Sequence, residues 1–296
     1  MSYSEGLSHK SVMLKEVLEF LAPEKNDVII DGTFGAGGYS SAILDASECS
    51  VIGIDRDPDI DNFVKQVEIK YGERFKFIPG CFGDLESIVE ENAIQKINGV
   101  VLDLGVSSMQ LEEADRGFSF NLKGELDMRM GKHGTSAKDV VNSFSEKDLA
   151  DLIYLYGDER NSRKIAKAIV TERRKEPITG TKQLSWIIST VNKRAGKIDP
   201  ATKTFQALRI WVNQELEEIN KILESLPKFL TPGARVVVVS FHSLEDRIIK
   251  NFLRNNKGLF HILTKKVVKP SREEIRSNNK SRSAVLRAAV YKGVGE

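Results

Sequence analysis

Four glycines occur within residues 32–38, directly after the apolar run Val28-Ile29-Ile30 and Asp31, in the string DGTFGAGGYS. A strand that enters so glycine-rich a loop before a helix exposes backbone N–H groups to a bound ligand. Asp55 ends the next apolar run, 24 residues after Asp31. At that spacing a carboxylate reaches the ribose hydroxyls of an adenosine. The pattern therefore predicts a cofactor that contains adenosine.

The loop alone does not decide which adenosine cofactor binds. The dinucleotide-binding fingerprint has glycine at its first, third and sixth positions, and counted from Gly35 the sixth position is Ser40. The pattern leaves a nicotinamide dinucleotide and S-adenosylmethionine open. Purely structural roles are also open: a tight turn for the glycines and a helix cap for Asp55. Phe82, a further candidate for the cofactor site, could equally be a core residue.

A further acid, Asp103, follows the apolar run Val100-Val101-Leu102. Ligands of open parallel sheets bind beyond the carboxyl ends of the strands, so we expect Asp103 at the ligand site. We interpret His242 as a hydrogen-bonded core residue rather than a catalytic one.

These residues need a sheet to position them, and the sequence predicts one. Short β-branched runs at 28–30, 51–54, 75–78 and 100–102 alternate with helix-like stretches, as in a series of βαβ units. After residue 110 the apolar spacing predicts helices around 149–156, 165–169 and 184–191, and one long helix over 202–226. Strand character returns only at 235–240. We therefore expect an α/β domain (1–110 and 211–296) that carries an inserted helical domain (111–210).

Composition limits the functional classes. The chain has 296 residues, is 41% hydrophobic and 29% charged, and contains no apolar run long enough for a membrane helix and no signal-like start. We expect a soluble cytoplasmic protein without membrane contact. Cys49 and Cys81 are too few for a disulfide framework, and the four histidines are scattered, so we predict no metal site.

The C-terminal stretch is strongly basic. The segment from Lys265 to Lys292 contains nine Lys or Arg residues and two Glu residues, which gives it a local charge of +7. This predicts either a surface for a polyanion or a solvated, partly disordered terminus.

Several ordered motifs resemble the bacterial ribosomal RNA small-subunit methyltransferase H family, also called MraW. They are the loop at 31–38 and segments starting at His9 (HKSVMLKE), Asp55 (DRDP), Asp103 (DLGVSSMQ), Arg116 (RGFSF, continuing to LDMRM at 126–130), Ser240 (SFHSLEDR) and Arg282 (RSAVLR). The resemblance implies a class I, Rossmann-like sheet with an inserted all-helical domain. It also implies methyl transfer from S-adenosylmethionine to the N4 amine of a cytidine in the decoding region of 16S rRNA, within the small ribosomal subunit.

The resemblance implies cofactor contacts from residues spread over four segments: Gly35, Gly37, Gly38, Tyr39, Asp55, Phe82, Asp103 and Gln110. The family commonly has histidine where this chain has Tyr39, so only a backbone contact carries over there. Asp103 is our candidate acceptor for an N4 hydrogen, although the Asp-Leu-Gly-Val string lacks the prolines that follow the catalytic residue in many amino methyltransferases.

RNA binding is expected from two basic regions. One is the stretch from Lys265 onward, and the other lies on the inserted helices at Arg163, Lys164, Lys167, Arg173, Arg174 and Lys175. Two alternatives stay open: an RNA-binding assembly factor without catalysis, and a nicotinamide-dependent oxidoreductase. The sequence also leaves a homodimer open.

Overall fold

The computed structural model describes residues 11–192 and 199–293. The described chain forms two compact units. The first contains the residues up to Gly105 and those from Leu216 onward, and the second spans Val106–Glu215. The borders predicted from the sequence, at 110/111 and 210/211, lie five residues from these. His9 and Lys10 of the N-terminal motif lie outside the described residues.

The first unit is built on a seven-stranded sheet in the order β3-β2-β1-β4-β5-β7-β6. Its strands are β1 (Val28–Asp31), β2 (Ser50–Asp55), β3 (Phe75–Pro79), β4 (Ile97–Asp103), β5 (Leu230–Ser240), β6 (Phe260–Ile262) and β7 (Val285–Tyr291). Strands β1 to β5 pair in parallel, and β7 is antiparallel to both neighbours. The strand order reverses between β1 and β4, so the crevice expected for a ligand lies at the carboxyl ends of these two strands.

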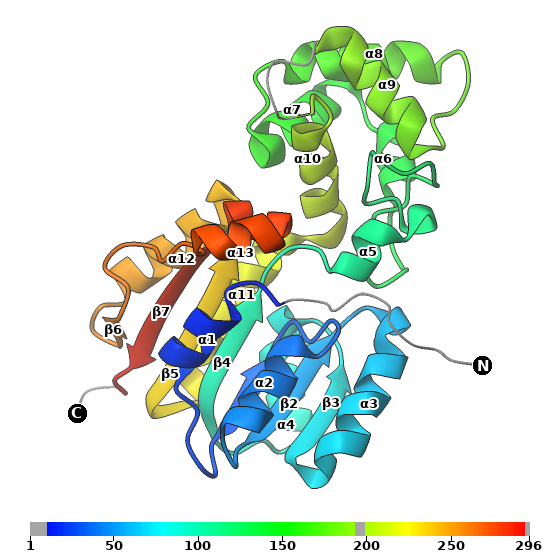
Figure 1. Ribbon diagram of the computed structural model, residues 1–296. Coiled ribbons are helices and arrows are strands. Elements are labelled where there is room, and N and C mark those ends of the chain that lie inside the picture. The colour runs from blue at the N-terminus through cyan, green and yellow to red at the C-terminus, as the bar shows by residue number, and fades with distance from the viewer. Residues whose placement is uncertain (1–10, 193–198, 294–296) are drawn as a thin grey trace. The chain divides into compact units, whose positions relative to one another are not determined.

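Helices cover both faces of this sheet (Figure 1). Helices α1 (Leu14–Leu21), α2 (Gly38–Ala46) and α3 (Asp61–Tyr71) lie on one face, and α4 (Leu85–Glu91), α11 (Glu215–Phe229) and α12 (Ser243–Asn255) lie on the other. Apolar side chains of the last three helices share one core with the strands, including Ile88, Ile222 and Ile249. A sheet that is buried on both faces explains the continuous apolar runs from which its strands were predicted.

The second unit is helical. It contains α5 (Ser108–Glu112), α6 (Ala137–Ser143), α7 (Glu146–Gly157), α8 (Ser162–Arg173), α9 (Thr181–Val191) and α10 (Thr202–Asn213). The apolar positions that predicted these helices, among them Ile153, Ile169 and Leu184, are buried in a separate core. No helix within 11–192 or 199–293 has the length and apolarity to cross a bilayer.

The single long helix predicted over 202–226 is wrong. Gln214, with a φ of 52°, separates α10 from α11 in the left-handed region. The residue before it, Asn213, is held by a distant loop: its side chain donates to the Met128 carbonyl at 2.7 Å and accepts from the Met130 N–H at 2.8 Å. The helix break depends on these tertiary contacts, so neither Gly nor Pro marks it in the sequence.

The prediction that strand character returns only at 235–240 is also wrong, because β6 and β7 follow. The basic C-terminal stretch is therefore no disordered tail over Val285–Tyr291: β7 pairs with β5 along six residues. Arg287 in this strand forms a two-pronged ion pair with Asp246 of α12, at 2.6 and 3.1 Å. Because Arg287 is charged, the sequence did not predict this otherwise apolar segment as a strand.

Candidate functional site

The glycine loop connects β1 to α2 through two left-handed positions. Gly35 has a φ of 52° and Gly37, the N-cap of α2, has a φ of 74°. Side chains rarely tolerate this backbone region, which explains glycine at both positions. Gly38 is the first residue of α2, so the loop delivers the N–H groups of the first turn to the carboxyl end of the sheet.

Asp31, at the end of β1, is fully buried under this loop. It accepts a hydrogen bond from the Ser40 hydroxyl at 2.7 Å, and Thr33 N–H lies 3.3 Å from its other oxygen. Burial raises the pKa of Asp31 to about 6, partly offset by these hydrogen bonds. Asp31 was not among the predicted site residues, although its place at a strand end before the loop is the same signal that selected Asp55 and Asp103.

Asp55, at the end of β2, holds the loop from the other side. Its Oδ2 accepts from Gly35 N–H at 2.8 Å and its Oδ1 accepts from Asp57 N–H at 2.9 Å. Burial raises the pKa of this carboxyl despite the two backbone donors. Each carboxylate oxygen can accept more than one hydrogen bond, so Asp55 can still accept from ribose hydroxyls.

Phe82 lies in the short turn after β3 and packs, half-buried, against the sheet core. The turn is held by Glu218 of α11, which accepts from the Cys81 thiol at 3.0 Å and from Lys221 at 2.9 Å. A Cβ at Gly83 would collide with Glu218, so the turn approaches the helix closely. Burial raises the pKa of the Cys81 thiol to about 12, which leaves it without nucleophilic character.

Asp103 ends β4, next to β1 at the point where the strand order reverses. Its backbone N–H donates to the Thr33 hydroxyl at 2.7 Å, which ties β4 to the glycine loop. Its Oδ1 atom is buried and has no hydrogen-bond partner among the described residues. Burial, followed by the charges of Asp31, Glu245 and Glu274, raises the pKa of Asp103 well above its ordinary value.

The Tyr39 side chain does not face open space. It is buried, and its hydroxyl donates a hydrogen bond to the Val12 carbonyl. The side chain is thus an anchor for the segment before α1, and a cofactor contact from Tyr39 falls to its backbone.

Gln110 belongs to the second unit, where it is buried. It forms a reciprocal capping box with Ser107 at the start of α5: Gln110 N–H donates to the Ser107 hydroxyl at 3.2 Å, and Ser107 N–H donates to the Gln110 side chain at 3.1 Å. Gln110 therefore has a clear structural role, and its predicted cofactor contact stays a prediction.

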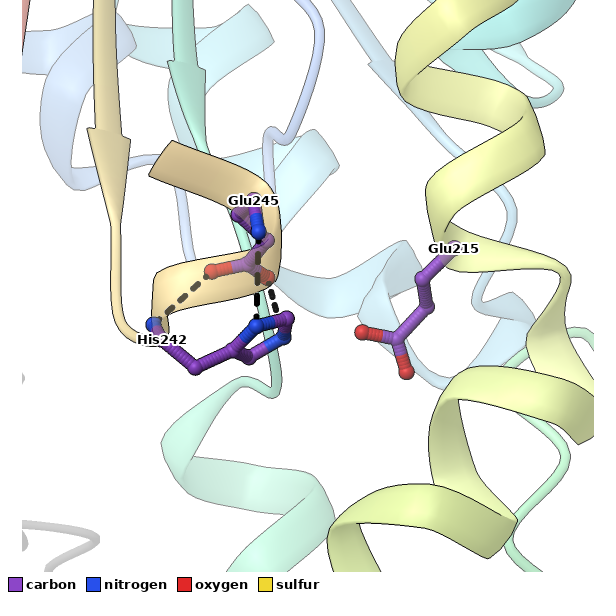
Figure 2. Close-up of side chains that lie close together, drawn as sticks. All are labelled: Glu215, His242 and Glu245. Atoms are coloured by element: carbon purple, nitrogen blue, oxygen red, sulfur yellow. Dashed lines mark hydrogen bonds and ion pairs between the residues drawn. The ribbon is translucent and has the colours of Figure 1, made fainter. Parts of the chain in front are cut away.

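His242 caps α12, as Figure 2 shows. Its Nδ1 accepts from Glu245 N–H at 3.4 Å, while a Glu245 oxygen accepts from the N–H groups of Phe241 and His242 at 2.8 and 3.2 Å. This capping box explains the spacing of His and Glu in the SFHSLEDR motif. Glu215, also drawn, belongs to the second unit, where both its carboxylate oxygens pair with Arg209 at 2.7 Å.

The first unit fits a cofactor that contains adenosine and carries a positive charge. The Asp55 carboxylate and the glycine loop suit the adenosine. The Oδ1 of Asp103 has no hydrogen-bond partner among the described residues, and it lies near other acids: the charges of Asp31, Glu245 and Glu274 all raise the pKa of this carboxyl. A sulfonium cofactor neutralises such charges, whereas a dinucleotide adds negative phosphates. The absence of a metal site stays a prediction.

The strand order gives the same answer. A dinucleotide-binding sheet has the order 3-2-1-4-5-6, whereas here an antiparallel β7 lies between β5 and β6. Fold and site together define a Rossmann-like methyltransferase that uses S-adenosylmethionine. The fold class predicted from the sequence is confirmed, and the oxidoreductase alternative is wrong.

Comparison with known proteins identifies the family. A family model described as the MraW methylase family matches residues 6–292, and the chain belongs to this family. Ribosomal RNA small subunit methyltransferase H of Neorickettsia sennetsu is 52% identical over 286 residues, covering 96% of each chain. The protein of the same name from Rickettsia africae is 48% identical over 302 residues, covering 95% of this chain and 97% of its own.

Among solved structures, an rRNA methylase from Streptococcus thermophilus aligns with 94% of this chain and 93% of its own at 11% identity. Its TM-score of 0.43 marks a likeness too distant to bear on function.

Proposed function

We propose that this protein transfers a methyl group from S-adenosylmethionine to the exocyclic N4 of the cytidine at position 1402 of 16S rRNA, in the cytoplasm. The observation that carries the proposal is the family match, which extends over residues 6–292 and so includes both units and every motif quoted above. The name shared by the relatives supports ribosomal RNA of the small subunit as the substrate.

We propose the following roles for the site residues. The loop at Gly35, Gly37 and Gly38 and the backbone of Tyr39 would hold the methionine side of the cofactor, Asp55 would accept from the ribose hydroxyls, and Phe82 would pack on the adenine. The cofactor contact predicted for Gln110 stays a prediction. When bound, the sulfonium supplies the methyl group and its own leaving group, so the protein's main task is to align the acceptor.

Asp103 is the proposed acceptor for a hydrogen of the cytidine N4 amine. That nitrogen's lone pair is delocalised into the ring, and a hydrogen bond donated from the amine to a carboxylate restores nucleophilicity. An ionised carboxylate is a stronger hydrogen-bond acceptor than a neutral carboxyl. Burial and neighbouring acids raise the pKa of Asp103, and a nearby positive charge lowers the pKa of a carboxyl. We therefore expect the cationic donor to make Asp103 a better acceptor.

RNA is proposed to bind through exposed basic residues. On α8 and just beyond it these are Arg163, Lys164, Lys167, Arg174 and Lys175, and in the C-terminal stretch they are Lys265, Lys266, Lys269, Arg272, Arg276, Lys280 and Arg282. Phosphate contacts help offset the few kcal/mol needed to move the target base out of its stack.

Mass spectrometry of 16S rRNA tests the proposal. A strain that lacks this protein should lose methylation at N4 of the target cytidine and regain it when the parent gene is returned. A returned Asp103→Asn gene should leave the site unmethylated while the purified variant still binds RNA. Full methylation without the protein would contradict the proposal. If methylation is lost and restored in the strain but the purified parent binds RNA without transferring a methyl group to it, the assembly factor is favoured.

A further inference from the structure

The segment Ser11–Met13, here called the N-terminal strap, lies against the end of the glycine loop and the first turn of α2. A Cβ on Gly38 would collide with the Ser11 hydroxyl, so the strap contacts the first residue of α2 directly. The Val12 carbonyl accepts from the Tyr39 hydroxyl one residue further along that helix. Both contacts fall on the residues whose backbone is proposed to hold the cofactor.

The strap is held in an unfavourable conformation. Met13 is fully buried and has a φ of 52°, a value that a residue with a side chain rarely adopts. Such a conformation persists only where surrounding contacts enforce it, and it points to a functional constraint. The strap therefore needs an anchor besides Tyr39.

Glu274 is that anchor. Its Oε1 accepts a hydrogen bond from the Met13 backbone N–H at 2.6 Å, across 261 residues of sequence. Glu274 lies on α13 (Arg272–Ser277), and its own N–H donates to the Ser271 hydroxyl at 3.0 Å, which fixes the start of that helix. Without Glu274 the buried N–H of Met13 would lose its partner, and such a loss is costly.

We propose that Glu274 is a positioning residue for the methyl donor: by holding Met13 it seats the N-terminal strap against Gly38 and Tyr39 and so keeps the first turn of α2 in its cofactor-binding conformation. The inference concerns cofactor binding alone, so it stands or falls independently of the RNA position that is methylated.

Titration calorimetry with S-adenosylhomocysteine, which is chemically stable, measures the effect on the full-length protein. Glu274→Ala should raise the dissociation constant about three- to tenfold, the range for one lost hydrogen bond. Glu274→Gln keeps an acceptor for Met13 and should bind nearly as the parent does. Glu273→Ala removes an exposed carboxylate from the same helix and is the matched control. Unchanged affinity in Glu274→Ala, or an equal loss in Glu273→Ala, would overturn the proposal.

A second pair of measurements separates positioning from a general loss of structure. In steady-state assays Glu274→Ala should raise the KM for S-adenosylmethionine without lowering kcat at saturation. If both anchors act through the strap, Glu274→Ala should cost less affinity in a Tyr39→Phe background than in the parent. Strictly additive losses, or a fall in kcat with unchanged KM, would refute the role of the strap.

Discussion

Ser40 illustrates what single residues in the loop do. It occupies the position where a dinucleotide-binding loop has its last glycine, and its hydroxyl donates to the buried Asp31 at 2.7 Å. The sequence showed that the glycine was missing but not why. The reason is a side-chain contact across nine residues, and only the folded loop reveals it. By contrast, the acids at the ends of β1, β2 and β4 could be located from the sequence, because apolar runs fix where the strands end.

Asp31 should make stability depend on pH. Its pKa rises from 3.8 to about 6 on folding, so the folded state binds the proton more tightly than the unfolded state. The resulting stabilisation is fully present below about pH 4 and is lost as the pH rises to about 6, up to about 3 kcal/mol. Urea unfolding of the ligand-free parent and of Asp31→Asn should therefore show the variant gaining stability relative to the parent across this window. A constant difference between the two proteins from pH 4 to pH 7 would contradict the assignment.

Asp55→Ala should weaken cofactor binding by roughly 1.5 to 3 kcal/mol, the range for hydrogen bonds to a charged group. The variant loses the acceptor for ribose hydroxyls and also the contact that holds Gly35 N–H. Calorimetry with S-adenosylhomocysteine checks the value, with Glu68→Ala on the exposed surface of α3 as the control. Equal affinity in the parent and Asp55→Ala would remove Asp55 from the site.

At the scale of elements, sequence patterns located those whose apolar spacing is regular and missed those set by distant contacts. Strands β1 to β4 were predictable because each is a short β-branched run. The division of the long helix at Gln214 was not, because no Gly or Pro marks it and the Asn213 side chain bonds to backbone groups of Met128 and Met130, which are distant in sequence. Strand β7 was missed because Arg287, which pairs with Asp246, made the segment look like part of a basic tail.

The same distinction applies to the basic residues of α8. Arg173 donates to the Val141 and Phe144 carbonyls at 2.7 and 2.6 Å, so its guanidinium supplies hydrogen-bond donors to the C-terminal end of α6. Arg173→Met keeps much of the apolar stem and should cost about 1 to 3 kcal/mol of unfolding free energy. Arg174→Met, next to it and exposed, should change stability little but weaken RNA binding. Chemical denaturation and RNA titration of both variants check this; equal stabilities would show that the Arg173 contacts contribute nothing.

At the scale of the whole molecule, the modest net charge of +2 conceals a concentration of positive charge in the C-terminal stretch. Part of this stretch is committed to the fold, since Arg287 pairs with Asp246 and Lys292 donates to the Lys257 carbonyl at 2.8 Å. The remaining basic residues are exposed around α13, which also carries Glu274, the proposed anchor of the strap. One short helix thus connects the proposed RNA surface to the cofactor loop, and mutations there must separate the two effects.

Salt dependence provides that separation. If Arg272 and Arg276 contact phosphates, changing both to Gln should flatten the plot of log affinity against log salt by roughly 1.4 to 1.8, at about 0.7 to 0.9 per contact. Affinity for S-adenosylhomocysteine should stay nearly constant, because Glu274 is untouched. The control is Lys65→Gln with Lys96→Gln, which removes the same charge from exposed positions elsewhere in the first unit. A titration with a 16S rRNA fragment that contains the decoding region gives the slopes. If the double arginine variant and the control have the same slope, α13 does not touch RNA, and the phosphate contacts have to come from the other exposed basic residues of the C-terminal stretch or from those of α8.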